Sequence, residues 1–236
     1  MTTTLITGAN KGLGFETARR LVAAGHQVWI GSRDTERGRK AAERLGARAV
    51  QLDVTDDVSV AEAAKAVEAD GGLDILVNNA GIQEEMRDGV VVVGPAELTA
   101  DTMRTTFDTN VFGTVRVTRA FLPLLQRSAS PVVVNVSSGL ASLSRVSTPD
   151  SPQYHYSGVA YPASKAAVNM ITVQYAKAFP QMRINAVEPG FTRTDLNGHA
   201  GRQSVEEGAE VIVRVAQVGP DGPTGGYFSA EGPLPW

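Results

Sequence analysis

Short runs of β-branched and other apolar residues alternate along the chain with longer segments in which apolar residues recur at helical spacing. The short runs are continuous, which is typical of strands buried on both faces of a parallel sheet. They predict strands at Thr3–Thr7, Gln27–Gly31, Ala47–Leu52, Ile75–Asn78, Val132–Ser137, Arg183–Val187 and Gly226–Ser229. The segments between them predict helices near Gly12–Ala24, Asp34–Leu45, Asp57–Ala69, Thr99–Gln126, Ala160–Phe179 and Val205–Gln217.

This alternation predicts an α/β fold, namely a Rossmann-type, doubly wound parallel sheet of about seven strands with helices on both faces. Ligands of such sheets bind outside the carboxyl ends of the strands. No Pro/Ser linker, low-complexity block or internal repeat divides the chain. We therefore expect one domain over residues 1–236.

Two segments depart from the alternation. Gln83–Glu97 combines charges with glycine, valine and proline, and predicts a loop or a short ribbon. Leu140–Val159 is longer than a typical connection between a strand and a helix. It is either a surface loop with aromatic residues packed beneath it or the wall of a binding pocket. We favour the wall, because the segment joins Ser138 to Tyr161.

Composition and charge exclude several classes of protein. The 236 residues are 42% hydrophobic and 20% charged, as in globular proteins, and a net charge of −3 without a long basic run argues against a nucleic-acid partner. The chain has no cysteine, and its histidines, His26, His155 and His199, are scattered, so we expect no metal site. Met1–Thr7 does not resemble a signal peptide and no apolar run approaches the ~20 residues that span a bilayer, so we expect a cytoplasmic protein without a membrane partner.

A glycine-rich loop follows the first predicted strand and opens the first predicted helix. Glycine permits positive φ there and lets the backbone approach a pyrophosphate at the positive end of the helix. A tight turn alone would explain such glycines, but the strand–loop–helix context favours a dinucleotide site. The expected contacts are Gly8, Asn10, Lys11, Gly12, Leu13 and Gly14.

The end of the second predicted strand indicates which dinucleotide binds. The chain there contains Ser32 and Arg33, with no acid at the strand tip to bond a ribose 2′-hydroxyl. Arg33, together with Lys11, can bond a 2′-phosphate, which favours NADPH or NADP⁺, although both could be solvated surface charges. Asp34 is the competing candidate for an NAD site, and we interpret it as the N-cap of the next helix.

Polar residues also follow the third and fourth predicted strands. Asp53, followed by Val54, could accept a hydrogen bond from the adenine amino group, or could cap a helix. Asn79, Ala80 and Gly81 form either an ordinary turn or the turn at the sheet edge that faces the dinucleotide. The position after a strand favours the second alternative.

Tyr161 and Lys165 are four residues apart in a predicted helix, so they share one face. A nearby ammonium favours phenolate and is expected to lower the tyrosine pKa from its reference near 10. Such a phenol can exchange a proton with a substrate oxygen, and together with a dinucleotide it indicates hydride transfer.

The order of these motifs resembles the short-chain dehydrogenase/reductase family over essentially the whole chain. The resemblance rests on the glycine loop, Asn-Asn-Ala-Gly at 78–81, Asn110, Ser138, Tyr161 with Lys165, and Pro189-Gly190. Lys11 with Arg33, and the long segment before Tyr161, look most like the NADPH-dependent carbonyl reductases.

The resemblance implies a role for each matching residue. Tyr161 is then the general acid, Ser138 stabilises the carbonyl oxygen, and Lys165 binds the nicotinamide ribose and lowers the Tyr161 pKa. Asn110 is implied to hold a water that continues a proton relay to Lys165. The implied neighbours of the nicotinamide and its ribose are Asn79, Ala80, Gly81, Pro189, Gly190, Thr192 and Thr194. The cofactor-binding half then covers about 1–110 and the catalytic half about 110–236.

The substrate side is expected to be an open pocket for apolar or aromatic ketones, aldehydes and the corresponding alcohols. Its expected lining is Leu140, Leu143, Tyr154, Tyr156, Phe191 and Leu196. The interval between Ser138 and Tyr161 is longer than in the simplest family members, which leaves homodimer, homotetramer and monomer open. The alternative functions are an NAD-linked alcohol dehydrogenase of the same family and a non-catalytic NADPH-sensing module.

Overall fold

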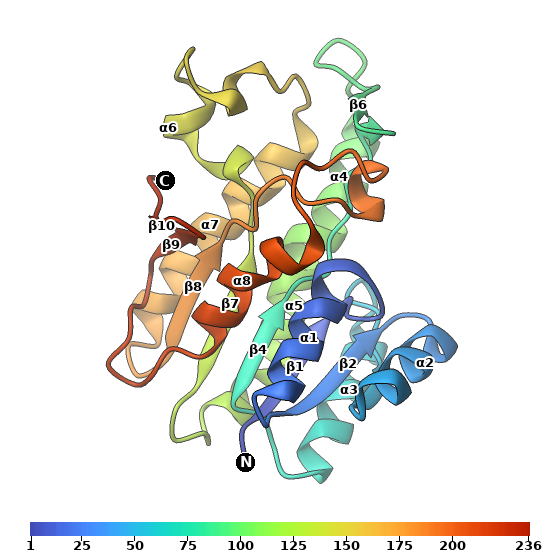
Figure 1. The fold of residues 1–236 in the computed structure, drawn as a ribbon, viewed down its shortest axis with the longest axis vertical. Helices are drawn as coiled ribbons and strands as arrows, with labels where there is room; N and C mark the ends of the chain where they lie inside the picture. The colour runs from blue at the N-terminus through green and yellow to red at the C-terminus, as the bar shows by residue number, and fades with distance from the viewer.

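The computed structural model describes residues 1–236 and has an eight-stranded sheet at its centre (Figure 1). The sheet contains β1 (Thr3–Thr7), β2 (Gln27–Ser32), β3 (Arg48–Gln51), β4 (Ile75–Asn78), β7 (Val132–Val136), β8 (Arg183–Val187), β9 (Tyr227–Ser229) and β10 (Gly232–Pro233). Their spatial order is β10-β9-β8-β7-β4-β1-β2-β3. Neighbouring strands are parallel except for β10, which pairs antiparallel with β9 at one edge. The predicted parallel sheet is therefore confirmed, with one short edge strand that the sequence pattern did not reveal.

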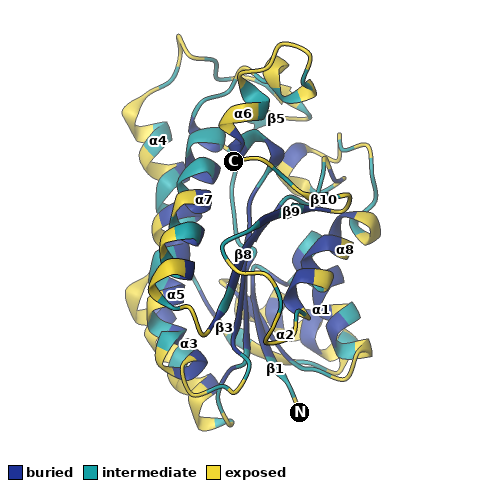
Figure 2. Cartoon of the chain, turned by 90° about the vertical axis from the view of Figure 1, so that its left-hand side faces the viewer, coloured by how far each residue is buried: buried dark blue, intermediate teal, exposed yellow.

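Helices cover both faces of this sheet. They are α1 (Gly12–Ala23), α2 (Thr35–Leu45), α3 (Asp57–Ala69), α4 (Ala100–Phe107), α5 (Gly113–Leu125), α6 (Leu143–Val146), α7 (Ala160–Ala178) and α8 (Val205–Ala216). Figure 2 shows α1, α2 and α8 on one side of the sheet and α3, α5 and α7 on the other. This is the doubly wound arrangement. No helix is both long and apolar enough to cross a bilayer.

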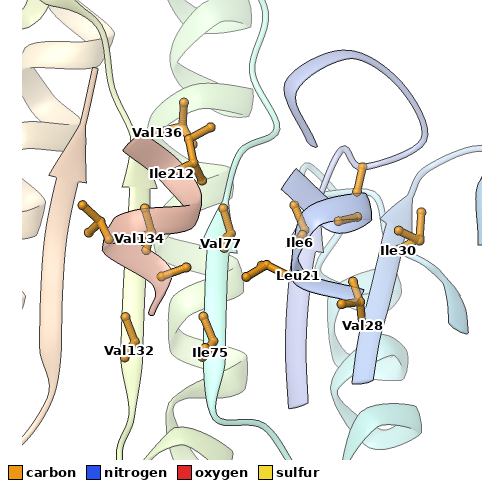
Figure 3. Close-up of a cluster of buried hydrophobic side chains, with 14 of the residues drawn as sticks. Ile6, Leu21, Val28, Ile30, Ile75, Val77, Val132, Val134, Val136 and Ile212 are labelled. Carbon is orange, nitrogen blue, oxygen red and sulfur yellow. The ribbon is translucent and has the colours of Figure 1, made fainter. Parts of the chain in front are cut away.

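The strands are apolar on both faces because each face is covered. Ile6 of β1 belongs to the cluster beneath α1 and α8, whereas its neighbour Leu5 belongs to the cluster beneath α3 and α5. Figure 3 shows the first cluster, in which Leu21 of α1 and Ile212 of α8 lie over the valines and isoleucines of four strands. Burial of each such side chain contributes about 1.5–3 kcal/mol.

The long helix predicted over Thr99–Gln126 is interrupted. After α4 the chain makes a π-helical turn at Asp108–Phe112 and then continues as α5. Such turns are frequent at functional sites because they place an extra residue on one side of the helix. Here the turn contains Asn110, whose side chain is buried against the chain that follows β4.

The two irregular segments have local structure of their own. Within Gln83–Glu97, β5 (Met86–Arg87) and β6 (Val90–Val91) form a two-stranded antiparallel ribbon. This confirms the short ribbon expected there. The segment between Ser138 and Tyr161 contains two 3₁₀ turns and the short helix α6.

Buried amide and hydroxyl side chains form a hydrogen-bonded network on one face of the sheet, near the ends of β4 and β7. Asn78 donates to Asn135 at 2.9 Å and to Thr118 of α5 at 3.0 Å. Asn135 in turn donates to Thr172 of α7 at 2.8 Å. These bonds connect two strands to two helices on the same face. They therefore fix the strand ends from which the candidate site is built.

We expect Asn135→Ala to lower the free energy of unfolding by about 1–3 kcal/mol, because the buried Asn78 amide and Thr172 hydroxyl each lose one hydrogen-bond partner. Urea unfolding followed by circular dichroism measures the change. Gln126→Ala, which truncates an exposed amide, is the control and should change stability by less than about 0.5 kcal/mol. Equal effects of the two substitutions would contradict a structural role for the buried network.

Candidate active site

A cleft of about 1330 Å³ opens at the carboxyl ends of the parallel strands. It brings together most of the residues that the sequence singled out. These are Gly8, Asn10, Lys11, Gly12, Leu13, Gly14, Arg33, Asp53, Val54, Asn79, Ala80, Gly81, Ser138, Leu140, Tyr156, Tyr161, Lys165, Pro189, Gly190, Phe191, Thr192, Thr194 and Leu196.

Four predicted residues do not line this cleft. Ser32 is buried, and its hydroxyl donates to the Asp34 carbonyl at 2.8 Å, so it stabilises the turn after β2. Leu143 and Tyr154 are exposed on the outer side of the segment before α7. Asn110 is buried behind the cleft wall. The turns between Ser138 and Tyr161 rotate Leu143 and Tyr154 away from the cleft, and a segment without periodicity could not predict this orientation.

The glycine loop fits the phosphates of a dinucleotide. Gly8 and Gly12 have φ of +64° and +56°, which favours glycine. A Cβ atom on Gly14 would lie 2.5 Å from Asn79 Nδ2 and 2.8 Å from the Gly8 carbonyl oxygen, so only glycine fits there. The loop leads into α1, whose N-cap Lys11 makes no side-chain cap. The first N–H groups of α1 therefore remain available for an anion.

The turn after β4 packs directly on this loop. Asn79 Nδ2 donates to the Thr7 carbonyl at 2.8 Å, and the Thr7 hydroxyl accepts from the N–H groups of Asn79 and Ala80 at 3.0 Å. The Asn79 side chain therefore stabilises the glycine loop. The ends of β1 and β4 are joined by these hydrogen bonds into one wall of the cleft.

The charged residues expected near an adenosine ribose differ in their partners. Asp34 accepts from the Arg37 N–H at 2.9 Å and caps α2, as expected from the sequence, so its carboxylate is occupied. Lys11 contacts Asp195, across the mouth of the cleft. Arg33 is exposed at the cleft and forms no ion pair. Arg33 is therefore the free cation at the end of β2.

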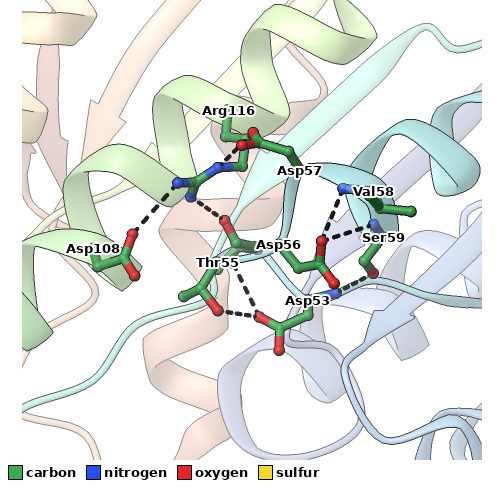
Figure 4. A network of polar contacts seen from close by, with 9 residues as sticks. Asp53, Thr55, Asp56, Asp57, Val58, Ser59, Asp108 and Arg116 are labelled. Carbon is green, nitrogen blue, oxygen red and sulfur yellow. Dashed lines mark hydrogen bonds and ion pairs between the residues drawn. The ribbon is translucent and has the colours of Figure 1, made fainter.

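The turn after β3 is built by a network of aspartates (Figure 4). The Asp53 carboxylate accepts from the Thr55 N–H at 2.9 Å and from its hydroxyl at 2.7 Å. The cap of α3 is Asp56, which accepts from the N–H groups of Val58 and Ser59. The alternative that Asp53 caps a helix is therefore wrong. Asp53 shapes the turn and remains on the cleft wall.

Arg116 of α5 stabilises this turn through hydrogen bonds, as Figure 4 also shows. Its guanidinium donates to the Val54 carbonyl at 2.7 Å, to Asp57 at 2.8 Å and to Asp108 at 3.4 Å. Because Asp108 begins the π-helical turn, the Arg116 side chain connects the turn after β3 to the segment that carries Asn110. No residue pattern along the chain indicates this contact.

Tyr161 lies in the first turn of α7 and is only 7% exposed. Burial raises the pKa of its phenol, and the nearby Ser138 side chain acts in the opposite direction. Ser138 comes from the end of β7, and its hydroxyl accepts from the Leu140 N–H at 3.2 Å. The Tyr161 and Ser138 side chains thus line the same cleft, although they lie on different elements.

Lys165 is one helical turn beyond Tyr161 and is 4% exposed. Its Nζ donates to the Val136 carbonyl at 2.8 Å and lies 5.8 Å from the Tyr161 ring centroid. Burial lowers the pKa of Lys165 to about 8. Desolvation of the phenol dominates and raises the pKa of Tyr161, so the expectation that Lys165 lowers this pKa stays a prediction.

Asn110 lies close to Lys165 but is occupied by other partners. Its Oδ1 accepts from the Ile82 N–H at 2.8 Å, while its Nδ2 donates to the Ile82 carbonyl and to the Ser164 hydroxyl, both at 3.0 Å. A Cβ atom on Gly81 would lie 3.3 Å from this Oδ1 and 3.5 Å from Lys165 Nζ. The side chain thus braces the chain after β4, and the relay role that the resemblance implies stays a prediction.

Glu188 is a partly buried carboxylate at this site that the sequence reasoning missed. It precedes Pro189 and accepts from the Gly190 N–H at 3.0 Å. Burial raises its pKa, whereas the N–H groups of Gly190 and Gly139 and the charge of Arg145 lower it. Glu188 therefore links the segment after Ser138 to the segment after β8. An acid directly after a buried strand was the available signal.

Several apolar side chains line the cleft. Of the expected lining residues, Leu140, Tyr156, Phe191 and Leu196 are in place. The ribbon of β5 and β6 contributes Met86 and Val91, which the sequence reasoning had not assigned to any site. The long segment before α7 is thus a wall of the cleft, as favoured from its position.

Comparisons with known proteins agree with this geometry. A family model described as short chain dehydrogenase matches residues 2–205. (+)-Neomenthol dehydrogenase of Arabidopsis thaliana is 34% identical over 96% of this chain and 95% of that protein. The structure of salutaridine reductase from Papaver somniferum has a TM-score of 0.82 and 29% identity, covering 98% of this chain and 100% of that chain. NADPH-bound carbonyl reductase from chicken fatty liver has a TM-score of 0.84 and 26% identity, covering 100% and 99%.

The chain belongs to the short-chain dehydrogenase family. It is therefore an oxidoreductase of a family that binds a nicotinamide cofactor. Its relatives include carbonyl reductases, as the order of its motifs had indicated.

The lowered pKa of Lys165 predicts a pH dependence of stability. Between pH 8 and 10.5 the folded protein binds fewer protons at Lys165 than the unfolded chain, so stability increases with pH in this window. Below about pH 8 the cost of burying the cation is fully present. We expect the free energy of unfolding of the wild type relative to Lys165→Met to rise by about 1–3 kcal/mol from pH 7 to pH 10. Urea unfolding at both pH values measures it, and a constant difference would contradict the assignment.

Proposed function

We propose that this protein reduces ketones or aldehydes to alcohols with NADPH as cofactor. The observation that carries the proposal is the pair of Ser138 and Tyr161 hydroxyls on the wall of a cleft that also contains the glycine loop. Two hydroxyl groups on different elements can hydrogen-bond one carbonyl oxygen from two directions. When bound, the nicotinamide supplies the hydride, and the protein has to orient the reactants and manage one proton.

Tyr161 serves as the general acid. Because burial raises the pKa of the phenol, the side chain is protonated at neutral pH. An alkoxide that forms from a carbonyl is a stronger base than a phenolate, so it takes the Tyr161 proton as the hydride arrives. Ser138 stabilises the negative charge that develops on the same oxygen.

Lys165 supports this transfer from inside the protein. Its ammonium lies beneath the Tyr161 ring and partly offsets the charge of the phenolate left after proton transfer. Since the pKa of Lys165 is near 8, the protonated form predominates at neutral pH. The family resemblance adds a contact between this ammonium and the nicotinamide ribose.

The cations at the mouth of the cleft support NADPH over NADH. Arg33 is exposed and free of ion pairs at the end of β2, where a 2′-phosphate is expected. Lys11 is held nearby by Asp195. Asp34, the acid that an NAD site would need, is engaged as a helix cap. A structural relative that is described as NADPH-bound points the same way.

The apolar walls support a medium-sized apolar or aromatic carbonyl compound as substrate. Leu140, Phe191 and Leu196 face the cleft together with Met86 and Val91 of the ribbon. Relatives of this chain are named neomenthol dehydrogenase, isopiperitenone reductase and salutaridine reductase. We therefore propose medium-sized apolar ketones as the first compounds to assay.

We expect Tyr161→Phe to lower kcat/KM for carbonyl reduction by about 10²–10⁴-fold, because the general acid is lost. The Kd for NADPH should stay within about threefold, since the phenol is not needed to hold the dinucleotide. NADPH oxidation with a panel of ketones and aldehydes, and a fluorescence titration of NADPH, measure the two quantities.

Tyr175→Phe, on the same helix but outside the cleft, is the control. Retained turnover in Tyr161→Phe would refute the acid, and NADPH binding without turnover in the wild type would favour a sensing module.

We expect Arg33→Ala to weaken NADPH binding by about 10–100-fold and to leave NADH binding unchanged, because a charge-assisted bond to the 2′-phosphate is lost. Titrations of both nucleotides measure the effect. Arg37→Ala removes a neighbouring cation that is paired with Asp34, and it should alter neither affinity. If Arg33→Ala leaves NADPH binding unaltered and the wild type prefers NADH, the NAD-linked alcohol dehydrogenase is the better assignment.

A further inference from the structure

One carboxylate outside the site described above is buried completely. Glu85 lies in the segment after β4, immediately before the ribbon of β5 and β6, and its exposure is 0%. It forms no ion pair with any lysine, arginine or histidine. A buried carboxylate is costly unless other groups take over its hydration. The structure must therefore supply these groups.

The partners of Glu85 are the first N–H groups of the catalytic helix α7. Its Oε1 accepts from the N–H groups of Val159 and Ala160, both at 2.5 Å, and its Oε2 accepts from the N–H of Tyr161 at 2.9 Å. These residues are more than 70 positions away in the sequence. The carboxylate also lies at the positive end of the helix dipole, which stabilises a negative charge.

Helix α7 needs this external cap because it has none of its own. Its N-cap is Val159, which cannot accept a hydrogen bond through its side chain, and no acid lies in its first turn. By contrast, α2, α3, α4 and α8 are capped by their own Asp34, Asp56, Thr99 and Ser204. Glu85 therefore performs for α7 what a local residue performs for these helices.

The surroundings of Glu85 restrict its position. Its carbonyl accepts from the Val92 N–H at 2.7 Å, which closes the base of the ribbon. A Cβ atom on Gly158 would lie 2.8 Å from Glu85 Oε2 and 2.7 Å from the Tyr156 hydroxyl, so a glycine is needed for the close approach. Gln83, two residues earlier, donates to the same Tyr156 hydroxyl at 2.7 Å. The segment thus holds the chain on both sides of Gly158.

We propose that Glu85 is the positioning residue for Tyr161: its carboxylate fixes the first turn of α7, and with it the phenol, against Ser138. It acts through the backbone N–H of Tyr161 and touches no reacting atom. The inference rests on the proposed function, because it assigns to Tyr161 the role of acid. It adds a residue from the ribbon segment to the machinery of proton transfer.

The substitution Glu85→Gln distinguishes positioning of Tyr161 through hydrogen bonds from packing by the side chain alone. Glutamine has the same shape but offers one acceptor oxygen, and its NH₂ group cannot accept from an N–H. The amide leaves the fewest N–H groups unpaired when its oxygen takes the place of Oε1, which serves Val159 and Ala160. The loss then falls on the N–H of Tyr161, so the catalytic residue itself loses its fixed position.

We expect Glu85→Gln to lower kcat for carbonyl reduction by roughly 10–100-fold, as expected for a displacement of about 1 Å at the reacting centre. The Kd for NADPH should stay within about threefold. The solvent deuterium isotope effect on kcat should increase, because proton donation by a misplaced phenol becomes the slow step. Glu97→Gln is the matched control, since Glu97 is an exposed carboxylate of the same segment that accepts from the Gly94 N–H.

Hydrogen exchange gives a readout that does not depend on turnover. In Glu85→Gln the amides at 159–161 should exchange at least about tenfold faster, whereas in Glu97→Gln they should not change. If the wild type reduces no carbonyl compound, the proposed function fails while this experiment still tests the cap. If Glu85→Gln does not fold, Glu85→Asp, which keeps the charge but is one methylene too short, should show the same loss of kcat and of protection.

Two results would overturn the proposal. The first is an unchanged kcat together with unchanged exchange at 159–161. The second is a parallel loss of kcat and NADPH affinity with an unaltered solvent isotope effect, because that combination indicates general loosening of the cleft and not misplacement of the acid.

Discussion

Tyr161 and Lys165 are carried by one helix, and both are almost completely removed from water. Desolvation moves the pKa of the phenol up and that of the ammonium down, so each group is pushed toward its neutral form. The neutral phenol is the form that can donate a proton. Burial, more than the attraction between the two side chains, therefore determines what this site can do before a substrate arrives.

The same burial requires that polar groups around the site be satisfied from within the protein. Lys165 uses the Val136 carbonyl, Asn110 uses the backbone of Ile82, and Glu188 uses the N–H groups next to Pro189 and Ser138. The bonds of Lys165 and Asn110 each join the chain at or after the end of one strand to another element. The wall of the cleft is consequently a connected hydrogen-bonded layer, in which a change at one strand end affects its neighbours.

The N-termini of α1 and α7 differ in whether their first N–H groups have hydrogen-bond partners. The first N–H groups of α1 are left without a side-chain cap beside the glycine loop, where an anionic ligand can use them. Those of α7 are occupied by Glu85, so that helix has no affinity left for an external anion at its start. The free helix end lies beside the glycine loop, where we propose that the dinucleotide binds.

Much of the fold was predictable because the responsible forces are local. Strands such as β4 and β7 consist of continuous apolar residues that only a doubly covered sheet can bury, and Asp34 is a cap whose partner lies three residues away. The π-helical turn around Asn110 was not predictable, since it depends on contacts with Ile82. The outward positions of Leu143 and Tyr154 were missed for a similar reason, because no periodicity governs the segment that carries them.

By itself, the sequence determined the parallel sheet and the glycine loop and indicated the side chains that we propose to react, since these follow from apolar runs, from backbone freedom at glycine and from residue spacing. Only the tertiary structure decided the burial of Tyr161 and Lys165, with its effect on their pKa values, and the use of Glu85 as a cap. The physical reason is that burial and hydrogen bonding between residues distant in the chain control the energy of a charge. These quantities exist only after the strand ends have come together.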